Sequence, residues 1–261
     1  MIILVSGDMK TRVALCVNKN IGLKITQFLK NNEDTEICLL YLTGENKSHD
    51  SKIIKSSGVK NKNIFRGNEI YKTEKHINFF RKKKIDFLIT VYWPWILQES
   101  FFQLAKQTIN FHPSLLPMNR GWYPHVHNII RNTRSGVTLH QISKKADEGK
   151  IWCQKEVKVN CTDTAKNLYD RLLRNIESLF KSNWNKIKNS KLKAFEQDHS
   201  KAIYYNKKDA QVYDEIDITK KIYPLELINI LRARTFGKKS FAYYKANNEK
   251  VYINLTLSKN L

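Results

Sequence analysis

The sequence predicts an α/β fold with a mainly parallel sheet, followed by a small C-terminal α+β region. In the first part of the chain, short apolar runs of strand length alternate with amphipathic segments of helical period. Parallel strands need such crossover connections, so the alternation favours an open parallel sheet. After about residue 193 this alternation of strands and helices ends, and the pattern indicates one short helix and an aromatic hairpin. We therefore expect a main domain at residues 1–193 and a smaller region at residues 194–261.

The elements of the first domain follow from these patterns. Buried strands are predicted for four apolar runs, at residues 12–17, 37–42, 86–93 and 108–112. Amphipathic helices are predicted between them, at residues 21–31 and 73–84. The segment IILVS at residues 2–6 is either an additional strand or the true first strand. We favour the additional strand, because VNKNIG then becomes a strand-to-helix loop.

A second strand pair and a long helix complete the expected domain. The pair comprises residues 136–142 and 149–159, and the loop SKKADEG divides it. Asx and Thr caps open the helix predicted at residues 161–180. In the C-terminal region we expect a helix at residues 223–235 and a hairpin at residues 241–255. This hairpin should turn at Asn247 and Asn248.

Composition excludes several classes of protein. The 261 residues include four cysteines without CxxC spacing, each in an apolar context, which favours buried thiols over a metal site or disulfides. The opening MIILVSGDMK lacks the basic n-region and the long apolar run of a signal peptide, and no run spans a bilayer. We expect a cytoplasmic protein that uses no metal and has no membrane partner.

The formal net charge of +22 raises the question of nucleic-acid binding. The excess is spread over surface-type segments, for example residues 44–84, which hold 12 Lys and Arg against 4 Asp and Glu. No basic stretch is interleaved with aromatic residues as in a stacking platform. The distribution favours a smaller phosphate-bearing partner over nucleic acid.

The stretch INFHPSLLPMNRG contains the first candidate site. Asn110 and His112 alternate with apolar residues, so they share one face of a predicted strand at its carboxyl end. Open α/β sheets place ligands there. An amide can donate to a developing oxyanion, and an imidazole can donate or take a proton near neutral pH. Pro113 and Pro117 restrict the loop that follows. The alternative is a strand-end pair that caps a turn.

Asp147, in KKADEGKI, is the second candidate. A carboxylate in this loop could orient His112 and hold its charged form. The alternative is an ordinary turn residue.

Three stretches resemble the folate-dependent formyltransferases: NFHPSLLPMNRG, then GVTLHQISKKADEGKIWCQKEV, then DTAKNLYDRL. That family includes glycinamide ribonucleotide transformylase, methionyl-tRNA formyltransferase and the nucleotide-sugar N-formyltransferases. The resemblance implies a Rossmann-like catalytic domain that uses 10-formyltetrahydrofolate. It assigns the catalytic roles to Asn110, His112 and Asp147. An amine would attack the formyl carbon, Asn110 and His112 would stabilise the oxyanion, and Asp147 would support the charge of His112.

The resemblance also implies where the folate binds. The pteridine would lie against the loop after the strand that ends in VYWPWIL, with Ser114 and Asp147 completing that site. The loop residues concerned, contributing largely through their backbone, are Trp93, Trp95, Ile96 and Leu97. Core packing is the alternative for the tryptophans.

Within the family, RGWYPHVHNII and the short C-terminal region resemble the nucleotide-sugar enzymes, which form dimers through that region. We therefore expect a homodimer that formylates a dTDP-linked amino-dideoxyhexose, such as dTDP-4-amino-4,6-dideoxyglucose, for surface glycans such as lipopolysaccharide O-antigen. Arg120 and Trp122 are candidates for binding this substrate. Candidates for its diphosphate, or alternatively surface cations, are Lys19, Arg232 and Arg234. The competing hypotheses are a methionyl-tRNA formyltransferase-like enzyme and a non-catalytic nucleic-acid-binding module.

Overall fold

The computed structural model describes residues 10–259, so the strand predicted at residues 2–6 lies outside the described residues. The chain forms two compact units. Unit 1 comprises residues 10–111, 140–145 and 180–194, and unit 2 comprises residues 112–139, 146–179 and 195–259. The boundary that the sequence suggests at residue 193 remains a prediction.

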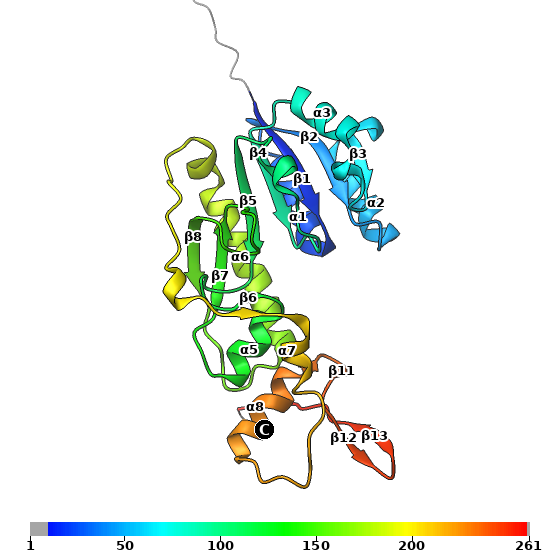
Figure 1. Ribbon diagram of the computed structural model, residues 1–261, viewed down its shortest axis with the longest axis vertical. Coiled ribbons are helices and arrows are strands. Elements are labelled where there is room, and N and C mark those ends of the chain that lie inside the picture. Colours follow the sequence, from blue (N-terminus) through cyan, green and yellow to red (C-terminus); the bar gives the residue numbers. More distant parts are fainter. Residues whose placement is uncertain (1–9, 260–261) are drawn as a thin grey trace, which may run out of the picture. The chain divides into compact units, whose positions relative to one another are not determined.

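Unit 1 is built on a parallel sheet with the strand order β3-β2-β1-β4-β5 (Figure 1). The strands are β1 (Thr11–Val17), β2 (Thr35–Leu42), β3 (Ile64–Arg66), β4 (Phe87–Val91) and β5 (Gln107–His112). The chain runs outward from β1 to β3 and then returns to place β4 beside β1, which is a topological switch point. The predicted α/β class with a mainly parallel sheet is confirmed.

Helices connect these strands. They are α1 (Lys19–Lys30), α2 (Lys47–Ser57), α3 (Glu74–Lys82) and α4 (Glu99–Phe102), with single 3-10 turns at Asn61–Asn63 and Ile70–Lys72. The helices predicted at residues 21–31 and 73–84 correspond to α1 and α3. The sequence reasoning missed α2 and β3, because α2 is mostly polar and β3 has only three residues.

Both faces of the unit 1 sheet are covered by apolar side chains, as a parallel sheet requires. On one face an aromatic cluster packs around Tyr41, which lies 5.7 Å from Phe101 between ring centroids. On the other face, the part of helix α6 that belongs to unit 1 contributes Phe180 and Trp184. The Trp184 ring is fully buried, 5.2 Å from Phe87, and its Nε1 donates to the Thr35 hydroxyl at 3.2 Å. This packing holds β4 and β5 in place.

Unit 2 contains the hydrogen-bonded neighbours β7 (Gly136–His140) and β8 (Ile151–Glu156), which match the second predicted strand pair. The long helix α6 (Ala165–Lys188) begins here and is eight residues longer than predicted at its C-terminal end. The other helices are α5 (Pro124–Ile130), α7 (Lys207–Gln211), α8 (Pro224–Ala233) and a 3-10 turn at His199–Lys201.

Short strand pairs complete unit 2. They are β6 (Arg120–Gly121) with β9 (Tyr204–Tyr205), β10 (Thr235–Phe236) with β11 (Lys239–Ser240), and β12 (Tyr243–Ala246) with β13 (Glu249–Tyr252). The last pair is the predicted hairpin (Figure 1). It turns at Asn247 and Asn248, whose φ angles of 50° and 64° suit asparagine.

None of the four cysteines, all of which lie within residues 10–259, forms a disulfide, but the expectation of burial holds only in part. Cys16 and Cys38 are buried, Cys153 is half-buried and Cys161 is exposed. Between residues 10 and 259, no helix combines the length and apolar character needed to cross a membrane.

Candidate active site

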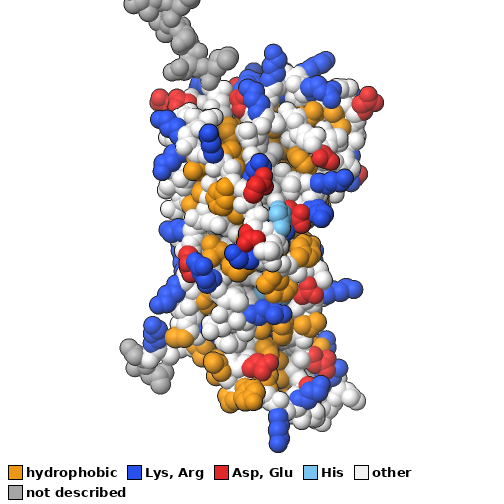
Figure 2. Space-filling view, turned by 60° about the vertical axis from the view of Figure 1, so that its left-hand side comes forward, with side chains coloured by type: hydrophobic (Ala, Val, Ile, Leu, Met, Phe, Trp, Pro, Cys, Tyr) orange, Lys and Arg blue, Asp and Glu red, His pale blue; other side chains and the backbone are white. Residues whose placement is uncertain are grey.

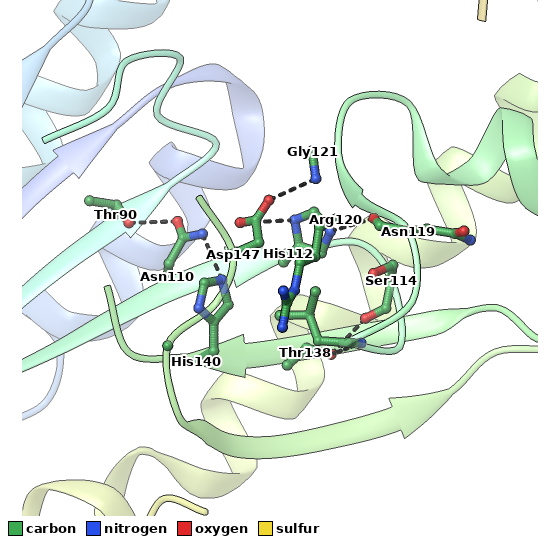
Figure 3. Close-up of polar contacts among 12 residues, drawn as sticks. Thr90, Asn110, His112, Ser114, Asn119, Arg120, Gly121, Thr138, His140 and Asp147 are labelled. Atoms are coloured by element: carbon green, nitrogen blue, oxygen red, sulfur yellow. Dashed lines mark hydrogen bonds and ion pairs between the residues drawn. The ribbon is translucent and has the colours of Figure 1, made fainter. Parts of the chain in front are cut away.

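Strand β5 carries both Asn110 and His112, and the alternation of side chains in a strand turns them to the same side. Asn110 belongs to a hydrogen-bonded group in unit 1 (Figure 3). Its Oδ1 accepts from the Thr90 hydroxyl at 2.6 Å, and its Nδ2 lies 2.9 Å from His140 Nε2. Thr90 on β4 is the register partner of Asn110 on β5, which explains how the two side chains meet.

The hydrogen bonds of His140 determine which of its ring nitrogens donates and which accepts. His140 Nδ1 lies 2.7 Å from the carbonyl oxygen of Gln141, which can only accept. The proton of a neutral His140 therefore sits on Nδ1, and Nε2 accepts from the Asn110 amide. The amide nitrogen carries two hydrogens, of which this contact uses one. Thr90 and His140 together hold the Asn110 amide with its oxygen and nitrogen in defined positions.

His112 is held in unit 2 by two acceptors on opposite edges of its ring (Figure 3). Its Nε2 lies 3.0 Å from the carbonyl oxygen of Asn119, so this nitrogen carries a proton. Its Nδ1 lies 3.4 Å from Asp147 Oδ1, an ion-pair distance when the ring is protonated. The side chain is 6% exposed, and that of Asp147 is 13% exposed. An acceptor facing each ring nitrogen favours the doubly protonated imidazolium.

Asp147 is fixed from both sides of its carboxylate. While Oδ1 faces His112, Oδ2 accepts from the backbone N–H of Gly121 at 2.9 Å. Asp147 has a φ angle of 57°, in the left-handed region that aspartate and asparagine tolerate. Gly121 has a φ angle of 85°, and a Cβ there would lie 2.2 Å from the carbonyl oxygen of Tyr205. Only glycine can bring this N–H to the carboxylate.

The sequence therefore singled out Asn110, His112 and Asp147, whose catalytic roles stay predictions, but not the residues that hold them in place. The pairs described above bring His112 to Asp147 and place Asn110 two residues away on the same strand. The supports that sequence reasoning missed are Thr90, His140 and the carbonyl group of Asn119. The available signals were a threonine within the apolar run FLITV and a histidine that ends the run GVTLH.

Thr90 provides a test of this support. We expect Thr90→Val, which keeps the shape and removes the hydroxyl, to lower turnover about tenfold, because a misoriented catalytic amide loses much of its effect. The cause would be orientation, so the Michaelis constants should change little. Steady-state kinetics checks this, with Thr43→Val as a control at another buried threonine of unit 1. Wild-type turnover in Thr90→Val would show that Asn110 needs no such support.

The loop after β4 contains the residues proposed for a planar ligand. Trp93 and Trp95 are half-buried, with ring centroids 5.0 Å apart at an interplanar angle of 79°. Ile96 is 73% exposed, while Leu97 is 5% exposed and belongs to the unit 1 core. The Leu97 side chain is therefore a core residue, so any contact it makes with a ligand must come from its backbone.

Ser114 lies in unit 2 and has a structural contact set. Its hydroxyl donates to the carbonyl oxygen of Met118 at 2.7 Å, and its own carbonyl accepts from the Thr138 hydroxyl at 2.6 Å (Figure 3). These contacts brace the loop between the two prolines. Ser114 is 1% exposed, so its hydroxyl supports the loop and is not presented to solvent.

Three arginines expected to bind substrate are buried in structural contacts, and their role in substrate binding stays a prediction. Arg120 bonds Glu148 at 3.2 Å, Gln197 at 2.7 Å and His199 at 3.1 Å. Arg232 donates to the carbonyl oxygens of residues 160 and 161, and Arg234 pairs with Asp214 at 2.5 Å. Each of the three is 4–5% exposed. Their guanidinium groups tie segments of unit 2 together.

Lys19 and Trp122 remain accessible. Lys19 starts α1 after the N-cap Asn18, at the carboxyl end of β1, and its Nζ lies 5.6 Å from the centroid of the Tyr92 ring. Burial lowers the pKa of Lys19, and Glu45 partly offsets this. Trp122 follows Gly121 and is 36% exposed, with Lys207 Nζ 4.0 Å from its ring centroid.

Basic side chains do not gather in one patch on the face drawn in Figure 2. Lys and Arg are scattered there among acidic and uncharged side chains. Several are paired, for example Arg134 with Glu156 at 2.6 Å. This agrees with the diffuse charge read from the sequence, and this face offers no track for a nucleic-acid backbone.

Two family models match the chain. A model described as formyl transferase matches residues 18–182, and one described as N-formyltransferase dimerization C-terminal domain matches residues 209–259. The first covers more than half of the chain and contains Asn110, His112 and Asp147. The protein belongs to the formyl transferase family, and the predicted membership and Rossmann-like catalytic domain are confirmed.

Individual relatives agree. The dTDP-4-amino-4,6-dideoxyglucose formyltransferase of Mycobacterium tuberculosis is 30% identical over 153 residues, 57% of this chain and 64% of that protein. The methionyl-tRNA formyltransferase of Thermotoga maritima is 34% identical over 131 residues, 49% of this chain and 42% of that protein. The chain thus spans less than two thirds of the length of these curated relatives.

Solved structures match over more of the chain. A 4-N formyltransferase from Francisella tularensis is 25% identical, with a TM-score of 0.83, and the match covers 97% of this chain and 100% of that one. WlaRD, a sugar 3N-formyl transferase whose structure was determined in the presence of dTDP and 5-N-formyl-THF, is also 25% identical. Its TM-score is 0.67, and the match covers 93% of this chain and 85% of that one.

Proposed function

We propose that this protein transfers a formyl group from 10-formyltetrahydrofolate to the amine of a nucleotide-linked amino sugar. The observation that carries the proposal is the pairing of Asp147 with His112. The strand that carries His112, β5, also presents the oriented amide of Asn110. These are a group that carries a proton, a carboxylate that supports it, and a hydrogen-bond donor for the oxyanion. Acyl transfer to an amine needs such groups. Membership of the formyl transferase family makes the acyl group a formyl group.

Each residue then has a defined task. The Asn110 amide donates a hydrogen bond to the oxygen on which negative charge develops. His112 would donate its proton to the tetrahydrofolate nitrogen that leaves and take up the proton that the attacking amine loses, so the ring ends in the state in which it began. Asp147 supports the charged ring across 3.4 Å. The burial of His112 excludes water from this ion pair and so strengthens it.

The loop after β4 suits the formyl donor, whose pteridine is flat and partly apolar. Trp93, Trp95 and Ile96 would hold it, since they offer two indole rings and an aliphatic side chain that is 73% exposed. When bound, the donor supplies an activated one-carbon group. The determination of WlaRD in the presence of 5-N-formyl-THF supports this choice.

The acceptor is proposed to be a dTDP-linked amino-dideoxyhexose, such as dTDP-4-amino-4,6-dideoxyglucose, made for a surface glycan such as lipopolysaccharide O-antigen. The name of the mycobacterial relative and the dTDP present with WlaRD support it. Formylation of methionyl-tRNA is the second candidate, favoured by the Thermotoga relative. We place it second because the chain's C-terminal part matches an N-formyltransferase dimerization domain, and its basic residues are scattered.

We also propose a homodimer formed through residues 209–259. Besides the family model, the support is a set of apolar side chains in this part that are 58–82% exposed: Val212, Ile218, Tyr223, Leu225 and Tyr252. Exposed apolar surface of this kind marks interfaces. Light scattering on the purified protein should give twice the chain mass of 30.7 kDa, and Tyr223→Asp with Leu225→Asp should shift it toward the monomer. A monomeric wild type would contradict the dimer.

The function is tested by incubating the purified chain with 10-formyltetrahydrofolate and a panel of acceptors. The panel holds dTDP- and UDP-linked 3-amino and 4-amino sugars and methionyl-tRNA. We expect formylation of a dTDP-amino sugar, and binding to tRNA that disappears by physiological salt. Formylation of methionyl-tRNA alone would overturn the sugar assignment, and no formyl transfer to any amine would overturn the proposed activity.

A further inference from the structure

An exposed group of aromatic rings lies in unit 2 around Gly121, whose backbone N–H donates to Asp147. We call Trp122, Tyr123 and Tyr204 the aromatic platform. Their exposed fractions are 36%, 39% and 57%, high values for large rings within an ordered part of the fold. Trp122 and Tyr123 lie 5.8 Å apart between ring centroids. Neither sequence reasoning nor the proposed chemistry gives Tyr204 a role.

The backbone brings the platform together through the parallel pairing of β6 with β9. Trp122 N donates to the carbonyl oxygen of Tyr205 at 2.8 Å, and Gly121 pairs with Tyr205 in the register. A Cβ on Gly121 would lie 3.0 Å from Cε2 of Tyr204, so the Tyr204 ring sits close against the Gly121 backbone. The same glycine donates to Asp147 Oδ2 at 2.9 Å. The platform therefore adjoins the proposed catalytic carboxylate.

Tyr205, the strand residue that follows Tyr204, is held by a ring stack. Tyr205, next to Tyr204, is stacked on His127 with centroids 3.6 Å apart and planes at 9°. The Arg131 guanidinium lies 5.5 Å from the centroid of the Tyr205 ring. Burial, and then the charge of Arg131, lowers the pKa of His127 to about 4, so its ring stays neutral near pH 7 and keeps the stack intact.

Tyr123 keeps its ring exposed at a conformational cost. Its φ angle is 54° and its ψ angle is 44°, a left-handed conformation that costs a tyrosine about 1 kcal/mol or more. Pro124 follows at the first turn of α5, so the backbone is fixed on both sides. Strain of this kind persists where the surrounding structure holds it, and it clusters at ligand sites.

Lys207 supplies a cation at the edge of the platform. Its Nζ lies 4.0 Å from the centroid of the Trp122 ring, and the residue is exposed. It is the first residue of α7, whose N-cap Asn206 forms a capping box with Asp209. The backbone of Lys207 is thus fixed while its ammonium group is exposed beside an aromatic surface.

We propose that Trp122, Tyr204 and Lys207 bind the pyrimidine nucleoside diphosphate part of the acceptor, a proposal that rests on the proposed function. The flat, apolar faces of Trp122 and Tyr204 suit a pyrimidine base, since stacking on an aromatic ring is available to any base. The Lys207 ammonium suits a phosphate oxygen. With the nucleotide on the platform, the attached sugar can extend past Gly121 toward Asp147, where the amine must react.

The test measures the binding of dTDP alone to the full chain by calorimetry, without the formyl donor. We expect Trp122→Leu to weaken binding about tenfold or more, because it removes an aromatic face on which the base stacks. Lys207→Met should weaken it about tenfold and make it less sensitive to salt, because it removes a charge and keeps the aliphatic stem. Lys208→Met, on the same helix at an exposed position, is the matched control and should bind as wild type does.

The outcomes separate this proposal from the proposed function. If Trp122→Leu and Lys207→Met both bind dTDP like the wild type while the wild type formylates a dTDP-amino sugar, the platform proposal is wrong and the function stands. If the variants lose dTDP binding although no sugar is formylated, the platform is a nucleotide site and the function is wrong. Equal weakening by Lys208→Met would show a general charge effect and would also overturn the role of Lys207. Circular dichroism of each variant excludes unfolding as the cause.

Discussion

Replacing His112 with asparagine should lower turnover about a hundredfold or more, the usual scale for losing an acid–base group. Asparagine can still donate a hydrogen bond but cannot take up a proton near neutral pH. The loss should therefore fall on the chemical step. Turnover is measured at saturating 10-formyltetrahydrofolate and dTDP-amino sugar.

The matching control is the affinity for dTDP. The contacts that hold His112 are those with Asn119 and Asp147, and the aromatic platform consists of other residues, so His112→Asn should bind dTDP as wild type does. Combined with Trp122→Leu, it separates catalysis from nucleotide binding. Near-wild-type turnover in a folded His112→Asn variant would show that the strand-end histidine is only a structural residue.

Asp147→Asn should lower the maximum rate and move the limiting pKa of the turnover–pH profile to lower pH. The amide has the shape of the carboxylate but lacks its charge, so it cannot stabilise an imidazolium across the 3.4 Å to His112 Nδ1. His112 then loses its proton at a lower pH, and the protonated fraction at neutral pH falls. We expect the maximum rate to drop about a hundredfold, because the buried imidazolium of His112 loses the carboxylate that stabilises its charge.

The backbone conformation makes this a clean test. Asp147 has a φ angle of 57°, which asparagine adopts as readily as aspartate, so the turn should survive the substitution. The Gly121 N–H can still donate to the amide oxygen of the new side chain. Turnover is followed from acid to alkaline pH for both proteins, and folate binding is measured separately. An unchanged profile and rate would make Asp147 a turn former and nothing more.

The sequence by itself determined the class of fold, and it pointed to Asn110, His112 and Asp147, whose catalytic roles stay predictions. Strand and helix periods identified β1, β2, β4 and β5, because buried parallel strands must be apolar over their whole length. Asn110 and His112 could be identified because polar residues are rare in such a run and alternate on one face. Asp147 needed the resemblance to the formyltransferases as well, since a lone aspartate before Glu-Gly is an ordinary turn.

Only the tertiary structure decided what the other polar residues do. Arg120, Arg232 and Arg234 are sequence candidates for an anionic substrate, but each is buried against partners that include Gln197 and Asp214. Thr90 and His140 are unremarkable in sequence, and they orient Asn110 because separate strands bring them within 2.6 Å and 2.9 Å of it. A local pattern fixes which face of a strand a side chain occupies. Whether that side chain meets solvent, a ligand or a distant partner depends on long-range packing, which no local pattern contains.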